Sequence, residues 1–164
     1  MARSYRVLFV SIVFASVFLA TAASAADKPF DPCSLLTPAE IQAVIGKPVQ
    51  AGTPKVQSNP LAGSDCTYVV GEYGSLNLLV KPLQYGETPE RVKAQLAKRK
   101  MAATDVAGIG AGAFLTSPGF GMVQMHVFQK DRYVLITLMV PGLEAPAVQP
   151  LAIQLMKTAV SRIK

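Results

Sequence analysis

The start of the fold is decided by residues 31–40, which read Asp31-Pro32-Cys33-Ser34-Leu35-Leu36-Thr37-Pro38-Ala39-Glu40. This stretch combines one of the chain's two cysteines with the signature of a helix N-terminus. Thr37 is the expected N-cap, because Pro38 fits the first helical position and Glu40 completes a capping box. The sequence therefore predicts a helix that begins at Pro38 and ends before Gly46, a favourable C-terminal cap.

The other cysteine, Cys66, precedes an apolar, aromatic segment. Two cysteines in an exported chain predict one structural disulfide, Cys33 to Cys66. That bridge would close a loop of about 34 residues and stabilise the fold by roughly 3–4 kcal/mol in the chain-entropy account. Free or intermolecular thiols are the alternative. A redox role has little support because no Cys-x-x-Cys motif occurs.

Residues 1–25 have the pattern of a cleaved signal peptide. Arg3 and Arg6 supply the positive region, an apolar run covers residues 7–20, and Ala23-Ser24-Ala25 fits the cleavage site. The alternative is a retained anchor helix, but the run is short for a membrane span. We therefore expect a mature single domain over residues 26–164, soluble in the periplasm or secreted, with no stable membrane insertion after cleavage.

The net charge of the chain and the residues before Cys33 limit the kinds of partner and anchor that we expect. Removing Arg3 and Arg6 lowers the formal net charge from +6 to +4, which gives no support for nucleic-acid binding. No lipidation box precedes Cys33, so we do not expect a lipid anchor.

The remaining sequence alternates helical and strand patterns. Strands are expected at 66–71, 75–84, 113–116, 121–129 and 133–140, with helices at 88–100 and 145–163. Residues 47–60 indicate an edge strand and a loop, residues 101–112 a loop and residues 117–119 a turn. The predicted class is α+β, an antiparallel sheet with helices packed on one face. The repeated Thr-Pro helix start, at Thr37 and Thr88, suggests a doubled helix-plus-strands unit.

Few residues suggest chemistry. His126, the single histidine, lies in a strong strand pattern, where a packed histidine is the simplest interpretation and an unrecognised hydrolase site the alternative. Gly108, Gly110 and Gly112 lack the spacing and context of a dinucleotide fingerprint. No catalytic residue, metal ligand or cofactor is predicted.

Three further groups of residues are candidates for binding. The basic cluster Arg91, Lys93, Lys98, Arg99 and Lys100 is expected on a solvated helix surface, with anion or membrane-surface contact as the alternative. Asp27, Asp31 and Asp65 lack the spacing of a calcium loop. A hydrophobic-ligand carrier would use a pocket lined by methionines, namely Met122, Met125, Met139 and Met156.

Three segments carry a resemblance to a known family: residues 31–37, Asp65-Cys66-Thr67-Tyr68, and residues 106–113. They resemble a family of small exported bacterial domains of unknown function, many of them lipoproteins, over nearly the whole mature chain. The resemblance implies a Cys33–Cys66 disulfide and carries over no catalytic residue. The chain differs from the lipoprotein members because it lacks a lipidation cysteine.

These patterns favour a non-enzymatic exported module that binds another protein or an envelope component. A small hydrophobic-ligand carrier is the alternative, followed by a hydrolase centred on His126.

Overall fold

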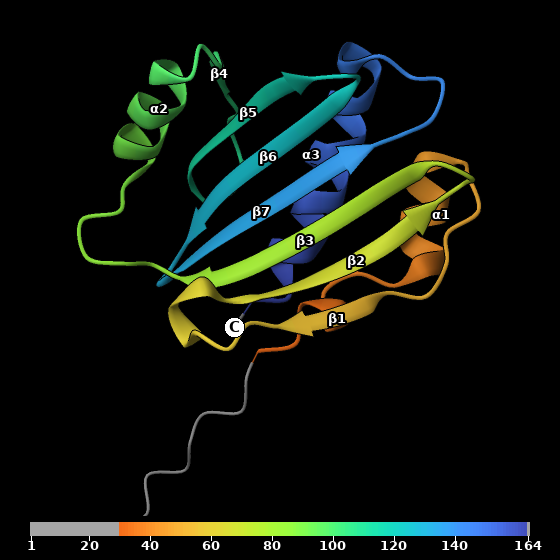
Figure 1. Cartoon of the computed structure of the whole chain (residues 1–164), viewed down its shortest axis with the longest axis horizontal. Helices are drawn as coiled ribbons and strands as arrows, with labels where there is room; N and C mark the ends of the chain where they lie inside the picture. The colour runs from red at the N-terminus through yellow and green to blue at the C-terminus, as the bar shows by residue number, and fades with distance from the viewer. Residues whose placement is uncertain (1–29, 164) are drawn as a thin grey trace, which may run out of the picture.

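Seven strands form one antiparallel sheet in the computed structural model, which describes residues 30–163 (Figure 1). The spatial order is β1-β2-β3-β7-β6-β5-β4. The strands are β1 (Thr53–Val56), β2 (Ser64–Val70), β3 (Gly74–Pro82), β4 (Ala103–Asp105), β5 (Ala111–Gly119), β6 (Met122–Gln129) and β7 (Arg132–Met139). The predicted α+β class is confirmed. The predicted signal segment, residues 1–25, lies outside the described residues.

Three α-helices pack on this sheet, but they do not share one face. They are α1 (Pro38–Ile45), α2 (Pro89–Lys98) and α3 (Ala145–Ser161), and short 3-10 turns occur at η1 (Pro32–Ser34) and η2 (Pro60–Ala62). Figure 1 shows α1 and α3 behind the sheet and α2 at one end of its other side. The expectation that all helices lie on one face was wrong for α2.

The main core lies between the sheet and the two helices α1 and α3. Alternate residues of the central strands point into it and are almost fully buried, including Leu76, Leu78, Val134, Ile136 and Leu138. The helices contribute fully buried residues as well, among them Ile41, Val148, Leu155 and Met156. A side chain of this size stabilises the fold by about 1.5–3 kcal/mol when it is fully buried.

The predicted start of α1 is confirmed in detail. The Thr37 side chain accepts a hydrogen bond from the Glu40 backbone N–H at 3.3 Å, and Glu40 Oε2 accepts one from the Thr37 N–H at 2.9 Å. Gly46 ends the helix with a φ of 72°, a left-handed conformation that glycine adopts without penalty. The Glu40 carboxylate also binds the Arg162 guanidinium, so the cap of α1 is tied to the end of α3.

The strands form two meanders that meet at the centre of the sheet. Strands β1–β3 and β5–β7 are each joined by neighbouring antiparallel pairs, and β3 pairs with β7. The suggested doubling therefore has a counterpart in the strands, whereas the helices break it because α1 and α2 lie on opposite faces.

Two local expectations about the strands were wrong. The expected loop 101–112 contains β4, which pairs with β5 at the sheet edge. The expected turn 117–119 lies within β5, whose pairing with β6 is irregular between Thr116 and Gly119. Both errors come from long-range pairing, which overrides the local preference of small residues and proline.

Candidate functional site

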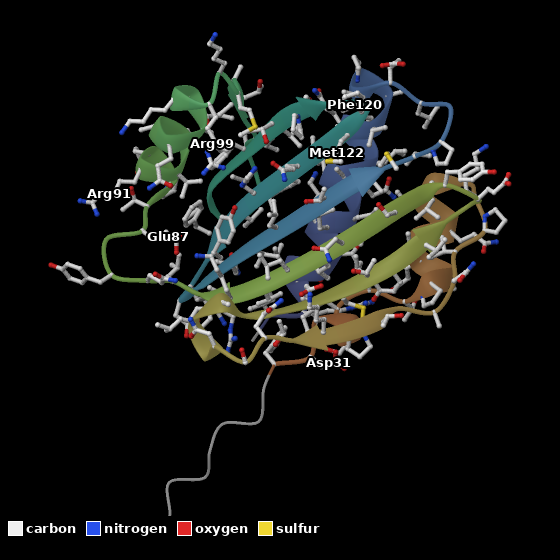
Figure 2. All side chains as sticks on the ribbon, in the orientation of Figure 1. Asp31, Glu87, Arg91, Arg99, Phe120 and Met122 are labelled. Carbon is white, nitrogen blue, oxygen red and sulfur yellow. A yellow bond between two sulfur atoms is a disulfide. The ribbon has the colours of Figure 1, made fainter. Side chains whose placement is uncertain are left out.

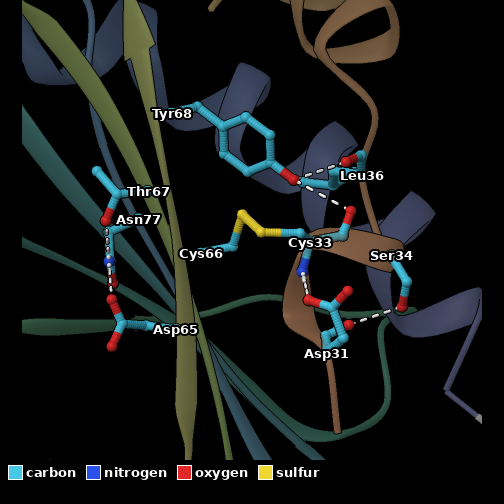
Figure 3. Close-up of a disulfide and its surroundings, with 9 residues drawn as sticks. All are labelled: Asp31, Cys33, Ser34, Leu36, Asp65, Cys66, Thr67, Tyr68 and Asn77. Atoms are coloured by element: carbon cyan, nitrogen blue, oxygen red, sulfur yellow. Dashed lines mark hydrogen bonds between the residues drawn. A yellow bond between two sulfur atoms is a disulfide. The ribbon is translucent and has the colours of Figure 1, made fainter. Parts of the chain in front are cut away.

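The disulfide lies on the side of the sheet that α1 and α3 cover, here called the covered side, and anchors the N-terminal segment to it. The sulfur atoms of Cys33 and Cys66 lie 2.01 Å apart, as the sequence predicts, so neither thiol is free (Figure 3). The Tyr68 hydroxyl donates to the backbone oxygens of Leu36 at 2.6 Å and Cys33 at 3.3 Å. Burial raises the pKa of Tyr68 to about 12, so it remains a donor at neutral pH. The bridge, fully buried at Cys66, is part of the scaffold and not a reactive site.

The opposite side, here called the open face, is the side of the sheet that carries Asn77, Gln124 and Thr137. Of the helices within residues 30–163, only α2 packs on it, and many of its side chains are half-exposed; this face is toward the viewer in Figure 2. Toward the middle and one end of the open face, the side chains of its three central strands are half-buried and uncharged; they are Ser75, Asn77, Leu79, Met122, Gln124, Leu135, Thr137 and Met139. At the other end the same strands carry the charged Lys81 and the buried His126, Phe128 and Tyr133.

A row of hydroxyl and amide side chains, the polar row, crosses the open face. Strand register places its members opposite one another on six strands: Thr53, Thr67, Asn77, Thr137, Gln124 and Thr116. The Asn77 amide donates to Thr67 at 2.9 Å and to Asp65 at 3.1 Å. Thr116 donates to the Gln124 side chain at 3.3 Å. The row therefore presents neutral hydrogen-bonding groups that are already held in place.

His126 lies beside the end of this row and has partners that the sequence did not reveal. Its Nε2 lies 3.2 Å from Thr116 Oγ1 and its Nδ1 lies 2.6 Å from the Tyr133 hydroxyl. The Phe114 ring stacks on the imidazole with the ring centroids 4.4 Å apart. Burial lowers the pKa of His126 to about 4 and raises that of Tyr133, so both are neutral at physiological pH.

Thr116, His126 and Tyr133 have the order of a nucleophile, a base and an orienting group. However, their exposed fractions are only 2%, 3% and 6%. A substrate therefore has no direct access to the Thr116 hydroxyl in this conformation. The arrangement is a satisfied buried network, which supports the interpretation of His126 as a packed histidine.

A second, smaller core lies on the open face beneath α2. It consists of Phe114, Phe128 and Tyr133, with Val92 and Leu96 of α2 packed against them. Lysines border it: Lys81 Nζ lies 5.0 Å from the centroid of the Tyr133 ring, and Lys93 Nζ lies 5.5 Å from that of Phe114. This cluster is aromatic at its centre and cationic at its rim.

The other sequence candidates are dispersed. Met125 and Met156 are buried in the main core, whereas Met122 and Met139 lie on the open face, so the four methionines do not line one pocket. In the basic cluster, Lys93 pairs with Asp105, and Arg91, Lys98, Arg99 and Lys100 are exposed on or just after α2. The glycines Gly108, Gly110 and Gly112 lead into and begin β5.

The aspartates considered for calcium have structural contacts. Asp31 accepts a hydrogen bond from the Cys33 N–H at 2.9 Å and caps η1, and Asp65 accepts from Asn77. Asp27 lies outside the described residues. Within residues 30–163, no three His, Cys, Asp or Glu side chains are grouped as a metal ion would require, and no helix is long and apolar enough to cross a membrane.

Comparison of the chain with protein-family models and with curated proteins gives no match. The resemblance to exported domains of unknown function therefore stays a prediction, and the function has to be argued from the geometry.

The sequence analysis did not predict the polar row or the partners of His126. Alternate polar positions such as Thr67, Asn77, Gln124 and Thr137 were visible within apolar strands. Their period of two indicates a face that is not fully buried. Which of them become neighbours depends on strand order and register, which local patterns do not determine.

Proposed function

We propose that this protein is an exported, non-enzymatic module that binds another protein or a cell-envelope component through the open face of its sheet. The observation that carries the proposal is the half-buried, uncharged centre of that face, because the other face is fully used for the core. A surface with amide, hydroxyl and apolar side chains can bind a neutral partner without desolvating buried charge.

The periplasmic or secreted location is part of this proposal. The signal pattern of residues 1–25 and the Cys33–Cys66 bridge both support it, because disulfides persist in oxidising compartments. Intact mass of the protein from a periplasmic extract should match a chain that begins at Ala26 and lacks two hydrogens. A full-length chain with two free thiols in the cytoplasm would contradict this location.

The binding role can be tested by substitution. Thr137→Arg places a charge at the centre of the open face, and Lys157→Glu changes an exposed residue of α3 on the other side. After chemical cross-linking in intact cells, we expect the wild type and Lys157→Glu to form the same discrete adduct and Thr137→Arg to lose it. Equal melting temperatures of the two purified variants control for folding. An adduct that persists in Thr137→Arg would argue against the open face.

A further inference from the structure

Helix α2 is attached to the molecule much more weakly than the other helices. None of its side chains is fully buried, whereas α3 buries five. Only Val92 and Leu96 of α2 pack on the second core, and Pro89 rests on the backbone of Gly112, where an added Cβ would lie 2.2 Å from the proline ring. The helix thus covers Phe114, Phe128 and Tyr133 with a small apolar contact.

Two ion pairs flank this contact. Glu87, just before α2, pairs with Lys81 at 2.7 Å, and Lys93 within α2 pairs with Asp105 of β4. Both lysine ammonium groups also lie over rings of the second core, as described above. The carboxylates of Glu87 and Asp105 therefore bind lysines that border the aromatic second core.

We propose that α2 is a displaceable cover over a binding site, and that the site takes an amphipathic acid with one apolar or aromatic body and one anionic group. The contacts that the protein itself makes at this site indicate the chemistry of the ligand. Val92 and Leu96 occupy the apolar site. Glu87, just before α2, neutralises Lys81 of β3, which is the lysine that stays in the site when α2 and its Lys93 move away. A molecule that combines an apolar body with an anion reproduces both sets of contacts when α2 moves away.

The surroundings of α2 provide a route of access. A solvent-open cleft of about 310 Å³ runs between the loop before α2 and its first turns, lined by Gln84, Tyr85, Gly86, Glu87, Arg91, Val92 and Gln95. Val92 belongs both to this cleft and to the contact with the second core, so the cleft reaches the edge of the covered site. The Arg91 side chain adds a further cation at this opening, as Figure 2 shows at the N-terminal end of α2.

The chain on both sides of α2 has conformations suited to hinges. Gly86 has a φ of 72° before the helix, and Lys100 has a φ of 60° after it. A lysine in the left-handed region is held there by its surroundings at some energetic cost. The Lys93–Asp105 pair is partly exposed and adds only weakly to the docking of α2, whereas the less exposed Lys81–Glu87 pair holds the chain just before the helix. The helix can therefore open without unfolding the main core.

Two fluorescent probes test the site. 1-Anilinonaphthalene-8-sulfonate carries an aromatic body and one anionic group, and N-phenyl-1-naphthylamine has the same ring system without the sulfonate. We expect saturable binding of the anionic probe at one site, at least tenfold tighter than the neutral probe. Lys81→Gln should reduce this preference for the anion severalfold, because Lys81 lies over the Tyr133 ring and stays in place when α2 moves. Lys98→Gln is the control because Lys98 is an exposed lysine of α2 that does not belong to the second core, and it should leave the preference unchanged.

The cover is tested by Leu96→Ala, which weakens the contact of α2 with the second core. If α2 must move for binding, this variant should tighten the binding of both probes by roughly fivefold, because the binding-competent state becomes more populated. Hydrogen exchange should show that the anionic probe deprotects residues 88–99 and leaves α3 unchanged. Weaker binding by Leu96→Ala, or equal effects of Lys81→Gln and Lys98→Gln, would overturn the proposal. That failure would leave the proposed macromolecular partner of the open face untouched.

Discussion

At the scale of single residues, Tyr68 links the sheet to the segment that starts the fold. Its ring is buried in the main core, and its hydroxyl satisfies the carbonyl oxygens of Leu36 and Cys33. The same strand carries Cys66, so one short piece of β2 holds residues 33–36 by a covalent bond and by hydrogen bonds. This explains how a segment with little regular structure becomes fixed.

Tyr68→Phe should lower the free energy of unfolding by about 1–3 kcal/mol, because it leaves a buried carbonyl oxygen without its donor. Urea denaturation followed by circular dichroism measures the change. Tyr73→Phe is a suitable control, since the Tyr73 side chain is 74% exposed. Equal stability of the Tyr68 and Tyr73 variants would contradict the anchoring role of the hydroxyl.

Removing the disulfide by the double substitution Cys33→Ser and Cys66→Ser should destabilise the fold by roughly 3–4 kcal/mol, because the bridge restricts the unfolded chain over a separation of 33 residues. Reductant should lower the melting temperature of the wild type and leave that of the double variant unchanged. A wild type whose melting temperature does not respond, with reduction verified by mass, would refute a stabilising bridge.

His126 predicts a pH dependence of stability. Its pKa is about 4 in the folded protein and 6.5 without burial, so the unfolded chain binds a proton that the native protein does not. Stability contributed by neutral His126 is complete above pH 6.5 and is lost as the pH falls toward 4, by about 3 kcal/mol in total.

This dependence can be separated from that of the carboxylates. Arg162 and the cap of α1 lower the pKa of Glu40 from 4.5 to about 2, so its contribution is lost only below about pH 4.5. Because the chain has one histidine, His126→Gln should flatten the slope of unfolding free energy between pH 4.5 and 6.5. An unchanged slope in urea titrations would contradict the burial of a neutral imidazole.

At the scale of elements, α1 and α2 start alike but differ in what they hold together. In each, a threonine caps the helix by accepting from a backbone N–H at 3.3 Å, Thr37 from Glu40 and Thr88 from Arg91. The α1 cap is coupled to α3 through Arg162, whereas α2 lies on the periphery.

Thr37→Ala should therefore lower the global free energy of unfolding by about 1–2 kcal/mol. Thr88→Ala should mainly increase hydrogen exchange within residues 88–99, with little change in the global transition. The comparison uses the same substitution at matched caps. A larger global loss for Thr88→Ala than for Thr37→Ala would contradict the peripheral role of α2.

At the scale of the whole molecule, the sequence predicted what is determined locally. The capping box, the Cys33–Cys66 pairing and the strand expected at 133–140 follow from short motifs and from alternation. The face on which α2 packs could not be predicted, because the stripe formed by Val92 and Leu96 shows that one side is buried and not against which surface. Likewise, the pairing of His126 with Thr116 and Tyr133 required the order β7-β6-β5.

The resulting molecule has two structurally different sides. The covered side carries the disulfide, α1, α3 and the main core, and it holds the sheet rigid. The open face carries the polar row, the neutral centre and the weakly docked α2. This division accounts for a disulfide-bonded scaffold that has a buried, satisfied histidine and still presents a large open face.

The most direct test of this division is position-specific photo-cross-linking in intact cells, with benzoylphenylalanine placed at Thr137 on the open face or at Lys157 on α3. We predict a discrete adduct from position 137 and none from position 157. Adducts from position 157 alone, or equal adducts from both positions, would contradict the assignment of the open face as the binding surface.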